Sequence, residues 1–314
     1  MPKKFIFIRA AAILFCLVLL ICVIIFPAEV AQSIRNSLSL CVRSVVPSLF
    51  VFSALASLFA RLGLFSAAGR LGKYVGLSPA CTAVAACGLL CGFPTSAVAA
   101  CTLFRAGEAD AAELRAVLPF CSNAGMAFVV GAVGEGMLGS RRAGYMLFFL
   151  QTALSIVFIL LFSRSKNPTI PMPRRRKKES FSHALVVSVS AAGGAMISVC
   201  AFIAFFGAAA DILCLIFPSV PAVVRATLCS VLEISRGCAE FARTDGISPV
   251  VRNIGIAFSL GFSGVSVSCQ IADRAGEISL PVLPYLAKKL VFGLAMAAIC
   301  GIFSIFAICI SIKL

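Results

Sequence analysis

The sequence predicts an all-α polytopic membrane protein with two similar halves, each containing a broken helix and a re-entrant hairpin. Of its 314 residues, 61% are hydrophobic and only 12% are charged. An ordinary globular domain is about 45–50% apolar and about 25% charged. Apolar runs long enough to cross a bilayer recur along the chain. Several are interrupted by Pro, Gly or polar residues, at a depth where freed backbone must face protein or a cavity.

The charges and cysteines fit the same class. The net charge of +15 is explained by the positive-inside rule, because the basic residues gather in short loops. The expected partner of this basic surface is the lipid bilayer, and no nucleic acid is expected. The chain has 15 cysteines and one histidine. Nearly all the cysteines lie in apolar runs without C-x-x-C spacing, so we interpret them as small hydrophobic residues rather than metal ligands.

Residues 1–44 are predicted to form an N-terminal spanning helix and an interfacial segment. The apolar run 5–26 is long enough to cross a hydrocarbon core of about 30 Å. It is longer than the core of a cleaved signal peptide and lacks a clear cleavage site. We therefore expect a retained helix in the cell (inner) membrane, with a cytoplasmic N-terminus. Residues 29–43 are mixed in character and are expected to lie at the interface.

Residues 45–163 are predicted to form the first half. Ser78 and Pro79 have the pattern of a helix start. The apolar run that follows is broken at residues 92–96, Gly-Phe-Pro-Thr-Ser, because proline lacks an amide donor and disfavours helix before it. A simple kink and a binding site near the membrane midplane are both open interpretations. The next run is interrupted at residues 122–125 and is expected to be a re-entrant hairpin, before a span over 144–162.

Residues 164–180 are predicted to form a basic, proline-rich cytoplasmic loop, because Arg174–Lys178 lie beside three prolines. The second half, 181–314, opens with an apolar helix and an outer loop over 211–221. It continues with a run centred on Glu233 and a second hairpin with its tip near Gly264. Lys288 and Lys289 precede the last span, 290–312.

The two halves share a plan of interrupted run, charged turn, second interrupted run and final span. Gly92 and Asn123 are separated by the same interval as Glu233 and Gly264. If the first broken run crosses outward, the hairpin around Asn123 enters from outside and the one around Gly264 enters from the cytoplasm. The halves are then inverted repeats, as in many secondary transporters.

Four motifs carry a resemblance to a known family. The sequence resembles the nucleoside-recognition, or Gate, domain membrane proteins, most closely the YlbJ-like sporulation integral membrane proteins, over residues 43–303. This resemblance implies a multi-pass membrane protein of spore-forming bacteria, with transport suspected. Val98 and Met126 stand where the family pattern has Lys and Pro. The motifs are Gly92-Phe93-Pro94-x-x-Ala97, Asn123-x-Gly125-x-x-Phe128-x-x-Gly131-x-Val133-Gly134, Glu233-Ile234-Ser235-x-Gly237 and Gly261-Phe262-Ser263-Gly264-Val265-Ser266-Val267-x-x-Gln270.

The candidate solute-binding residues lie at the interruptions. Asn and Gln supply donors and acceptors that suit a neutral hydroxylated or heterocyclic ligand. Glu233 is the sharpest candidate, because a carboxylate inside an apolar helix is costly and usually faces a cavity or a partner. It could bind a coupling cation, carry a proton or accept hydrogen bonds; the alternative is an ion pair with Arg236 or Arg252. The candidates are Gly92, Pro94, Thr95, Ser96, Ser122, Asn123, Gly125, Glu233, Ser235, Gly237, Ser263, Gly264, Ser266 and Gln270.

These features predict a secondary transporter or permease for a small polar solute, without a cofactor and coupled to Na⁺ or H⁺. The alternative is a non-transporting membrane scaffold in spore envelope assembly, in which the polar tips hold helix to helix. A homo-oligomer or other sporulation membrane proteins are the expected partners. An enzyme is not expected, because the sequence offers no metal cluster, phosphate loop or Ser-His-Asp set.

Overall fold

The computed structural model describes residues 3–64, 69, 72, 74, 76–163 and 180–311, and these residues form helices and connections without a strand. Four helices among them are long and apolar enough to cross a membrane, or five if a bent N-terminal pair is one span. Large apolar side chains on these helices are exposed, such as Ile197 at 75% and Leu161 at 66%. A lipid environment explains this exposure. The chain is therefore an all-α multi-pass membrane protein, as predicted.

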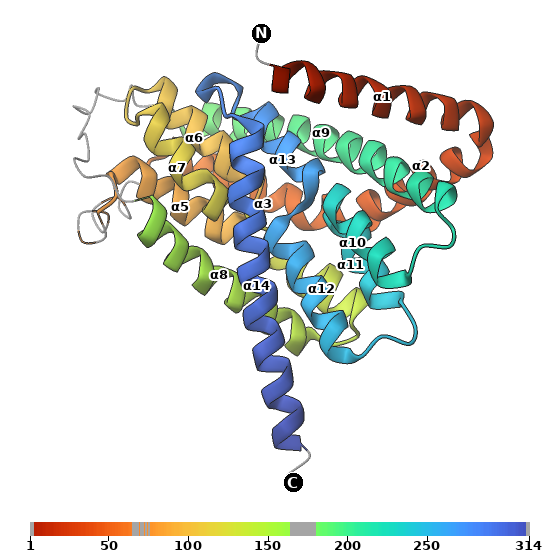
Figure 1. The fold of residues 1–314 in the computed structure, drawn as a ribbon. Helices are drawn as coiled ribbons and strands as arrows, with labels where there is room; N and C mark the ends of the chain where they lie inside the picture. Colours follow the sequence, from red (N-terminus) through yellow and green to blue (C-terminus); the bar gives the residue numbers. More distant parts are fainter. Residues whose placement is uncertain are drawn as a thin grey trace.

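The elements follow one another in the order shown by the colours of Figure 1. The predicted loop 164–180 lies outside the described residues, except for Ser180, which caps the next helix. The elements are α1 (Lys3–Ile25), α2 (Pro27–Leu40), η1 (Cys41–Val45), α3 (Val46–Arg61), α5 (Pro79–Cys91), α6 (Thr95–Arg105), α7 (Ala111–Cys121), η2 (Ala127–Met137), α8 (Arg141–Phe162), α9 (Phe181–Ile216), α10 (Ala222–Leu232), α11 (Ile234–Arg243), α12 (Pro249–Phe262), α13 (Gly264–Arg274), η3 (Gly276–Ile278) and α14 (Val282–Ser311).

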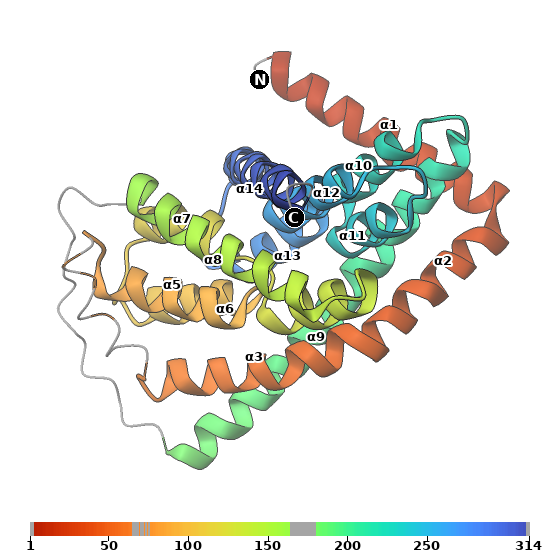
Figure 2. The same cartoon turned by 90° about the horizontal axis from the view of Figure 1, so that it is seen from below.

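The helices α2, α3 and α9 form one outer side of the molecule (Figure 2). The chain bends by 104° between α1 and α2, with Pro27 in the first turn of α2. The long helix α9 packs against both α2 and α3. The outer loop predicted over 211–221 is wrong in its first part, because α9 continues to Ile216. Asp211 is accommodated in this helix by Ser33 and Arg236, which both donate to its carboxylate.

The first re-entrant hairpin is formed by α5 and α6, and not by the segment around Asn123. Ser78 caps α5 through its side chain, as predicted. A Cβ added to Gly88 would lie 3.0 Å from the Cβ of Ser96, whereas residues eight apart in a continuous helix are separated by about 12 Å. The chain therefore reverses at residues 92–94. Helix α8 packs on η2 and also on α7, and Ser163 at its end donates to the carbonyl of Ala116 in α7. A single helix therefore runs back along both η2 and α7, so these two elements form a broken crossing.

The second hairpin is formed by α10 and α11, with Glu233 at the reversal. A Cβ on Gly237 would lie 2.4 Å from the Cα of Ser230, and the guanidinium of Arg225 is 3.6 Å from the carboxylate of Glu240 on the facing leg. By contrast, α12 and α13 form one candidate span, Pro249–Arg274. It is interrupted at Ser263, whose φ is 67°. The hairpin predicted around Gly264 is therefore wrong in the same way as the first.

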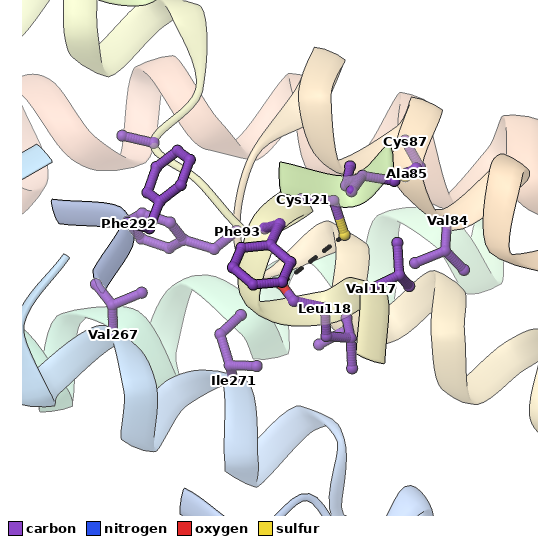
Figure 3. Close-up of a cluster of buried hydrophobic side chains, with 14 of the residues drawn as sticks. Val84, Ala85, Cys87, Phe93, Val117, Leu118, Cys121, Val267, Ile271 and Phe292 are labelled. Carbon is purple, nitrogen blue, oxygen red and sulfur yellow. Dashed lines mark hydrogen bonds between the residues drawn. The ribbon is translucent and has the colours of Figure 1, made fainter. Parts of the chain in front are cut away.

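Each half does contain one hairpin and one broken span, although in the opposite order to the prediction. The order of leading helix, hairpin, broken span and final span occurs twice, as α3 to α8 and as α9 to α14. The inverted orientation of the halves stays a prediction. One hydrophobic core joins the halves. In Figure 3 the ring of Phe93 lies between Leu118 of α7 and the α13 side chains Val267 and Ile271.

Candidate solute-binding site

The tip of the first hairpin is fixed to the break that follows it. The amide of Phe93 donates to the carbonyl oxygen of Asn123 at 2.9 Å. Gly92 has a φ of 75°, a conformation that glycine adopts without steric cost. A Cβ at this position would lie 2.5 Å from the amide nitrogen of Gly125. Glycine is therefore required at 92 both by the turn and by the close approach of the two backbones.

The second hairpin meets its own break in a similar way. A Cβ added to Gly264 would lie 3.1 Å from the carbonyl oxygen of Leu232 and 3.2 Å from the amide nitrogen of Glu233. The hydroxyl of Ser263 donates to the carbonyl of Leu260 at 3.0 Å, which satisfies one carbonyl freed by the break. In each half, the tip of the hairpin therefore contacts the interruption of the next span.

Both hairpin tips, the break after α7 and helix α13 border one small cavity between the halves, whereas Ser263, Gly264 and Ser266 do not line it. Its volume is about 10 Å³, which is room for about one water molecule. Residues of η1, α3 and α9 close it on the outer side. The lining residues are Val45, Leu49, Phe93, Gly125, Phe128, Val199, Ile203, Glu233, Ile234, Ser235, Val267 and Gln270.

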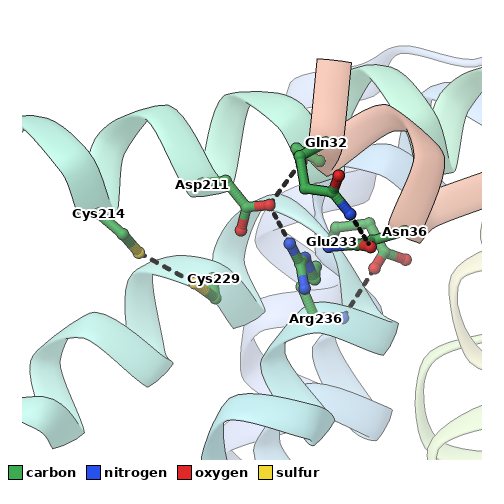
Figure 4. Close-up of polar contacts among 8 residues, drawn as sticks. Gln32, Asn36, Asp211, Cys214, Cys229, Glu233 and Arg236 are labelled. Atoms are coloured by element: carbon green, nitrogen blue, oxygen red, sulfur yellow. Dashed lines mark hydrogen bonds and ion pairs between the residues drawn. The ribbon is translucent and has the colours of Figure 1, made fainter. Parts of the chain in front are cut away.

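Glu233 is fully buried and only half of its carboxylate has a partner. Its Oε2 accepts a hydrogen bond from the backbone amide of Arg236 at 2.8 Å and so caps α11, where a carboxylate is also stabilised by the helix dipole. Its Oε1 has no hydrogen-bond partner. The guanidinium of Arg236 is turned to Asp211 instead (Figure 4). Glu233 thus forms no ion pair with Arg236, Arg252 or any other residue that the structure describes.

Gln270 places a second unpartnered acceptor beside the same cavity. Its Nε2 donates to the hydroxyl of Ser266 at 3.2 Å, while its Oε1 has no partner. A buried polar atom without a partner costs about 1–3 kcal/mol, and more if it is charged. Two acceptors at one cavity therefore favour an occupant that supplies donors: a cation, a proton, or a solute with NH or OH groups.

The polar residues of the first half are bonded to protein rather than to the cavity. Ser96 and Ser122 share a hydrogen bond of 2.7 Å between their hydroxyls. Asn123 donates to Ser155 of α8 at 2.5 Å, and Thr95 donates to the carbonyl of Gly92 at 2.5 Å. Pro94 and Thr95 border a separate cavity of about 20 Å³ against α3 and α9. Gly237 is packed between the legs of its hairpin.

A wide cleft connects the second hairpin with the outside of the molecule. Its volume is about 870 Å³, and it shares Glu233 and Ser235 with the central cavity. Helices α2 and α11 with η1 and η2 line it, and they contribute Asn36, Arg43, Arg236 and Arg243. Glu233 and Ser235 therefore face both the cleft and the central cavity.

Sequence reasoning missed Lys289, which lies two turns inside α14 rather than before the last span. Its side chain is fully buried, and its ammonium donates to Oδ1 of Asn123 at 2.9 Å. Two adjacent lysines beside an apolar run are typical of a membrane boundary, which hid this role. The signal that could have revealed it is Pro281, which lies eight residues before Lys289 and directly before the first residue of α14.

No known family profile matches the sequence, and no curated protein sequence matches it. Solved structures of the concentrative nucleoside transporter CNTnw do match the structure. A point variant in an intermediate state is 15% identical, with a TM-score of 0.60, covering 94% of this chain and 85% of that one. The chain has the concentrative nucleoside transporter fold. An inward-facing, substrate-bound CNTnw structure is 14% identical with a TM-score of 0.56, covering 97% of this chain and 87% of that one. An outward-facing CNTnw variant is 13% identical, with a TM-score of 0.57.

Proposed function

We propose that this chain is a secondary transporter or permease that carries a small polar solute through the site where the four interruptions meet. The observation that carries the proposal is the pair of unpartnered acceptors, Oε1 of Glu233 and Oε1 of Gln270, beside one cavity bordered by both hairpin tips, the break after α7 and helix α13. Ionisable groups inside membrane proteins are usually functional. Nucleosides are the first solutes to test, because the similar solved structures are nucleoside transporters.

The structure holds this site closed. A cavity of about 10 Å³ accepts about one water and no nucleoside, whereas the adjoining cleft of about 870 Å³ is large enough for one. We infer that loading requires the tip of α10 and α11 to move away from α3 and α9. The carboxylate of Glu233 is the proposed site of a coupling cation, Na⁺ or H⁺. The Gate-domain, YlbJ-like family and the N-terminus in the cytoplasm are part of this proposal.

The test is uptake into proteoliposomes that contain the purified full chain. The wild type, Glu233→Gln and Glu135→Gln are compared on a panel of nucleosides, amino acids and ions, with and without Na⁺ and pH gradients. Glu135 is the matched control, because its exposed carboxylate pairs with Arg141 at 2.8 Å away from the cavity. We expect uptake of at least one solute, reduced about tenfold or more by Glu233→Gln only. No uptake, or equal loss in both variants, would refute the proposal.

A non-transporting scaffold in spore envelope assembly is the second candidate. It is favoured by the first-half polar residues, whose hydrogen bonds join helix to helix: Ser96 to Ser122 and Asn123 to Ser155. Such interhelical bonds are worth about 0.6 kcal/mol on average. Under this function, sporulation would tolerate Glu233→Gln and Asn123→Ala, and wild-type proteoliposomes would transport none of the panel.

A further inference from the structure

In the break after α7 the protein itself satisfies every freed carbonyl from Phe120 to Gly125. Three side chains contribute: Asn123 of the break, Gln151 of α8 and Lys289 of α14. The carbonyl of Phe120 accepts from Nδ2 of Asn123, that of Cys121 from the amide of Asn123, and that of Ser122 from Nζ of Lys289. The carbonyl of Asn123 accepts from the amide of Phe93, that of Ala124 from Nε2 of Gln151, and that of Gly125 from the amides of Phe128 and Val129.

Lys289 is the unusual member of this set, because its ionisable amine is fully buried in the core. Its Nζ donates to Oδ1 of Asn123 at 2.9 Å and to the carbonyl of Ser122 at 3.4 Å. It also lies 5.1 Å from the centre of the Phe292 ring, within range of a cation–π interaction. It forms no ion pair with any carboxylate of the described residues. The ammonium is therefore held by oxygen dipoles and an aromatic face alone.

The ammonium is tolerated in the core because it lies at the C-terminal end of α7. Ser122 is the C-cap of α7, so Nζ lies at the negative end of the helix dipole. In broken helices of secondary transporters, unwound carbonyls and the C-terminal ends of half-helices are the groups that coordinate a free cation. The same type of oxygen set is occupied here by a side chain of the protein.

We propose that the ammonium of Lys289 takes the place of a bound metal cation in the break after α7. It occupies the position between the carbonyl oxygen of Ser122 and Oδ1 of Asn123, the oxygen cage of this break, so the break binds no free metal cation. Through Asn123, whose carbonyl accepts from Phe93, Lys289 also positions the tip of the first hairpin. This inference goes beyond transport and does not depend on it, because it concerns what occupies the break in the folded protein.

The experiment compares thermal unfolding in NaCl, KCl and choline chloride at equal ionic strength. A thiol-reactive fluorogenic dye reports unfolding, because the chain has many buried free cysteines. All variants are made in a Glu233→Gln background, so that a cation at Glu233 does not contribute. Failure of the proposed transport therefore leaves this test unaffected.

We expect the background protein to show the same Tm in all three salts. Lys289→Ala should lower Tm by roughly 5 °C in choline chloride, since it leaves buried acceptors unpaired, and Na⁺ or K⁺ should restore part of the loss by filling the vacated cage. Lys289→Met fills the space without a charge, so its loss should not respond to salt. Lys288→Ala on the half-buried neighbour should behave as the background. Adding Asn123→Ala to Lys289→Ala should abolish the restoration.

Two results would overturn the proposal. The first is a Lys289→Ala variant whose Tm is the same in choline and in Na⁺ or K⁺, because an emptied cation cage must respond to cations. The second is a background protein that Na⁺ or K⁺ stabilises and that loses this response with Asn123→Ala. If Lys289→Ala cannot be purified, the background protein and Lys289→Met decide the question. Salt-independent Tm values of both proteins then support the proposal, and the second result overturns it.

Discussion

Arg236 contacts Glu233 through its backbone and not through its guanidinium: the amide of Arg236 donates to Oε2 of Glu233, while the guanidinium pairs with Asp211. The cap of α11 and the link from α11 to α9 are thus separate interactions of one residue. Oε1 of Glu233 is left without a partner and faces the cavity. The two interactions can therefore be removed independently by mutation.

Arg236→Ala should destabilise the protein while leaving the cap of α11 in place. The substitution keeps the amide that caps α11 but leaves Asp211 with Ser33 as its remaining side-chain partner. We expect a loss of about 1–3 kcal/mol, as for other removed partners of half-buried polar groups. A double-mutant cycle with Asp211→Asn, read by thermal unfolding, should show coupling of about 1 kcal/mol or more. Additive losses would show that the pair contributes little.

Gly237→Ala should disrupt the second hairpin. The new Cβ would lie 2.2 Å from Oγ and 2.4 Å from Cα of Ser230, and the backbone contact can be relieved only by separating the legs. We expect destabilisation of about 2 kcal/mol or more, seen as a lower Tm. The matched control is Gly193→Ala on α9, where nothing lies within 4 Å of the added methyl group. It should be neutral or stabilising by up to about 1 kcal/mol. A deleterious Gly193→Ala would reveal a partner or second copy on that face.

Ser96 and Ser122 should behave as a pair. Their hydroxyls share a 2.7 Å hydrogen bond in a fully buried position. Removing one hydroxyl leaves the other with a lost partner, so Ser96→Ala and Ser122→Ala should each cost about 0.6 kcal/mol and no more than about 1.7 kcal/mol. The double variant should cost no more than the worse single variant. Thermal unfolding of the four proteins checks this, and strictly additive losses would contradict it.

The cleft can be distinguished from the core by labelling. In a cysteine-free background, Ala239→Cys lies in the lining of the cleft, while Ala100→Cys is fully buried and outside it. A membrane-impermeant maleimide should label position 239 from one side of the membrane and leave position 100 unlabelled. The side that labels position 239 identifies where the cleft opens. Equal labelling at both positions would contradict the closed packing of the first hairpin.

The positions of the interruptions could be predicted from the sequence, because helix ends have local chemistry. Ser78 with Pro79, the Gly-Phe-Pro turn and the glycine at 264 mark helix ends that the structure contains. The direction of the next helix has no such local signal. It depends on side-by-side contacts, such as those of Gly237 with Ser230 and of Arg225 with Glu240. The assignment of hairpins and crossings was reversed for this reason.

The candidate site could be predicted in part. Glu233, Ser235 and Gln270 line the central cavity, and an acid inside an apolar run was a sufficient signal for the first of them. Ser122 and Asn123 have the same polarity, but their partners Gln151, Ser155 and Lys289 come from distant helices. The sequence shows which side chains need a partner in the membrane. Only the folded arrangement shows which already have one within the protein.

The contact between each hairpin tip and its neighbouring break determines how this molecule can open. Phe93 is bonded to Asn123 in one half, and Gly264 abuts Leu232 and Glu233 in the other. If the protein transports as proposed, we expect each tip to move together with its break as one unit. Access to the buried carboxylate would then come from sliding of one unit against the other, or against α3 and α9, and not from a single loop that opens alone.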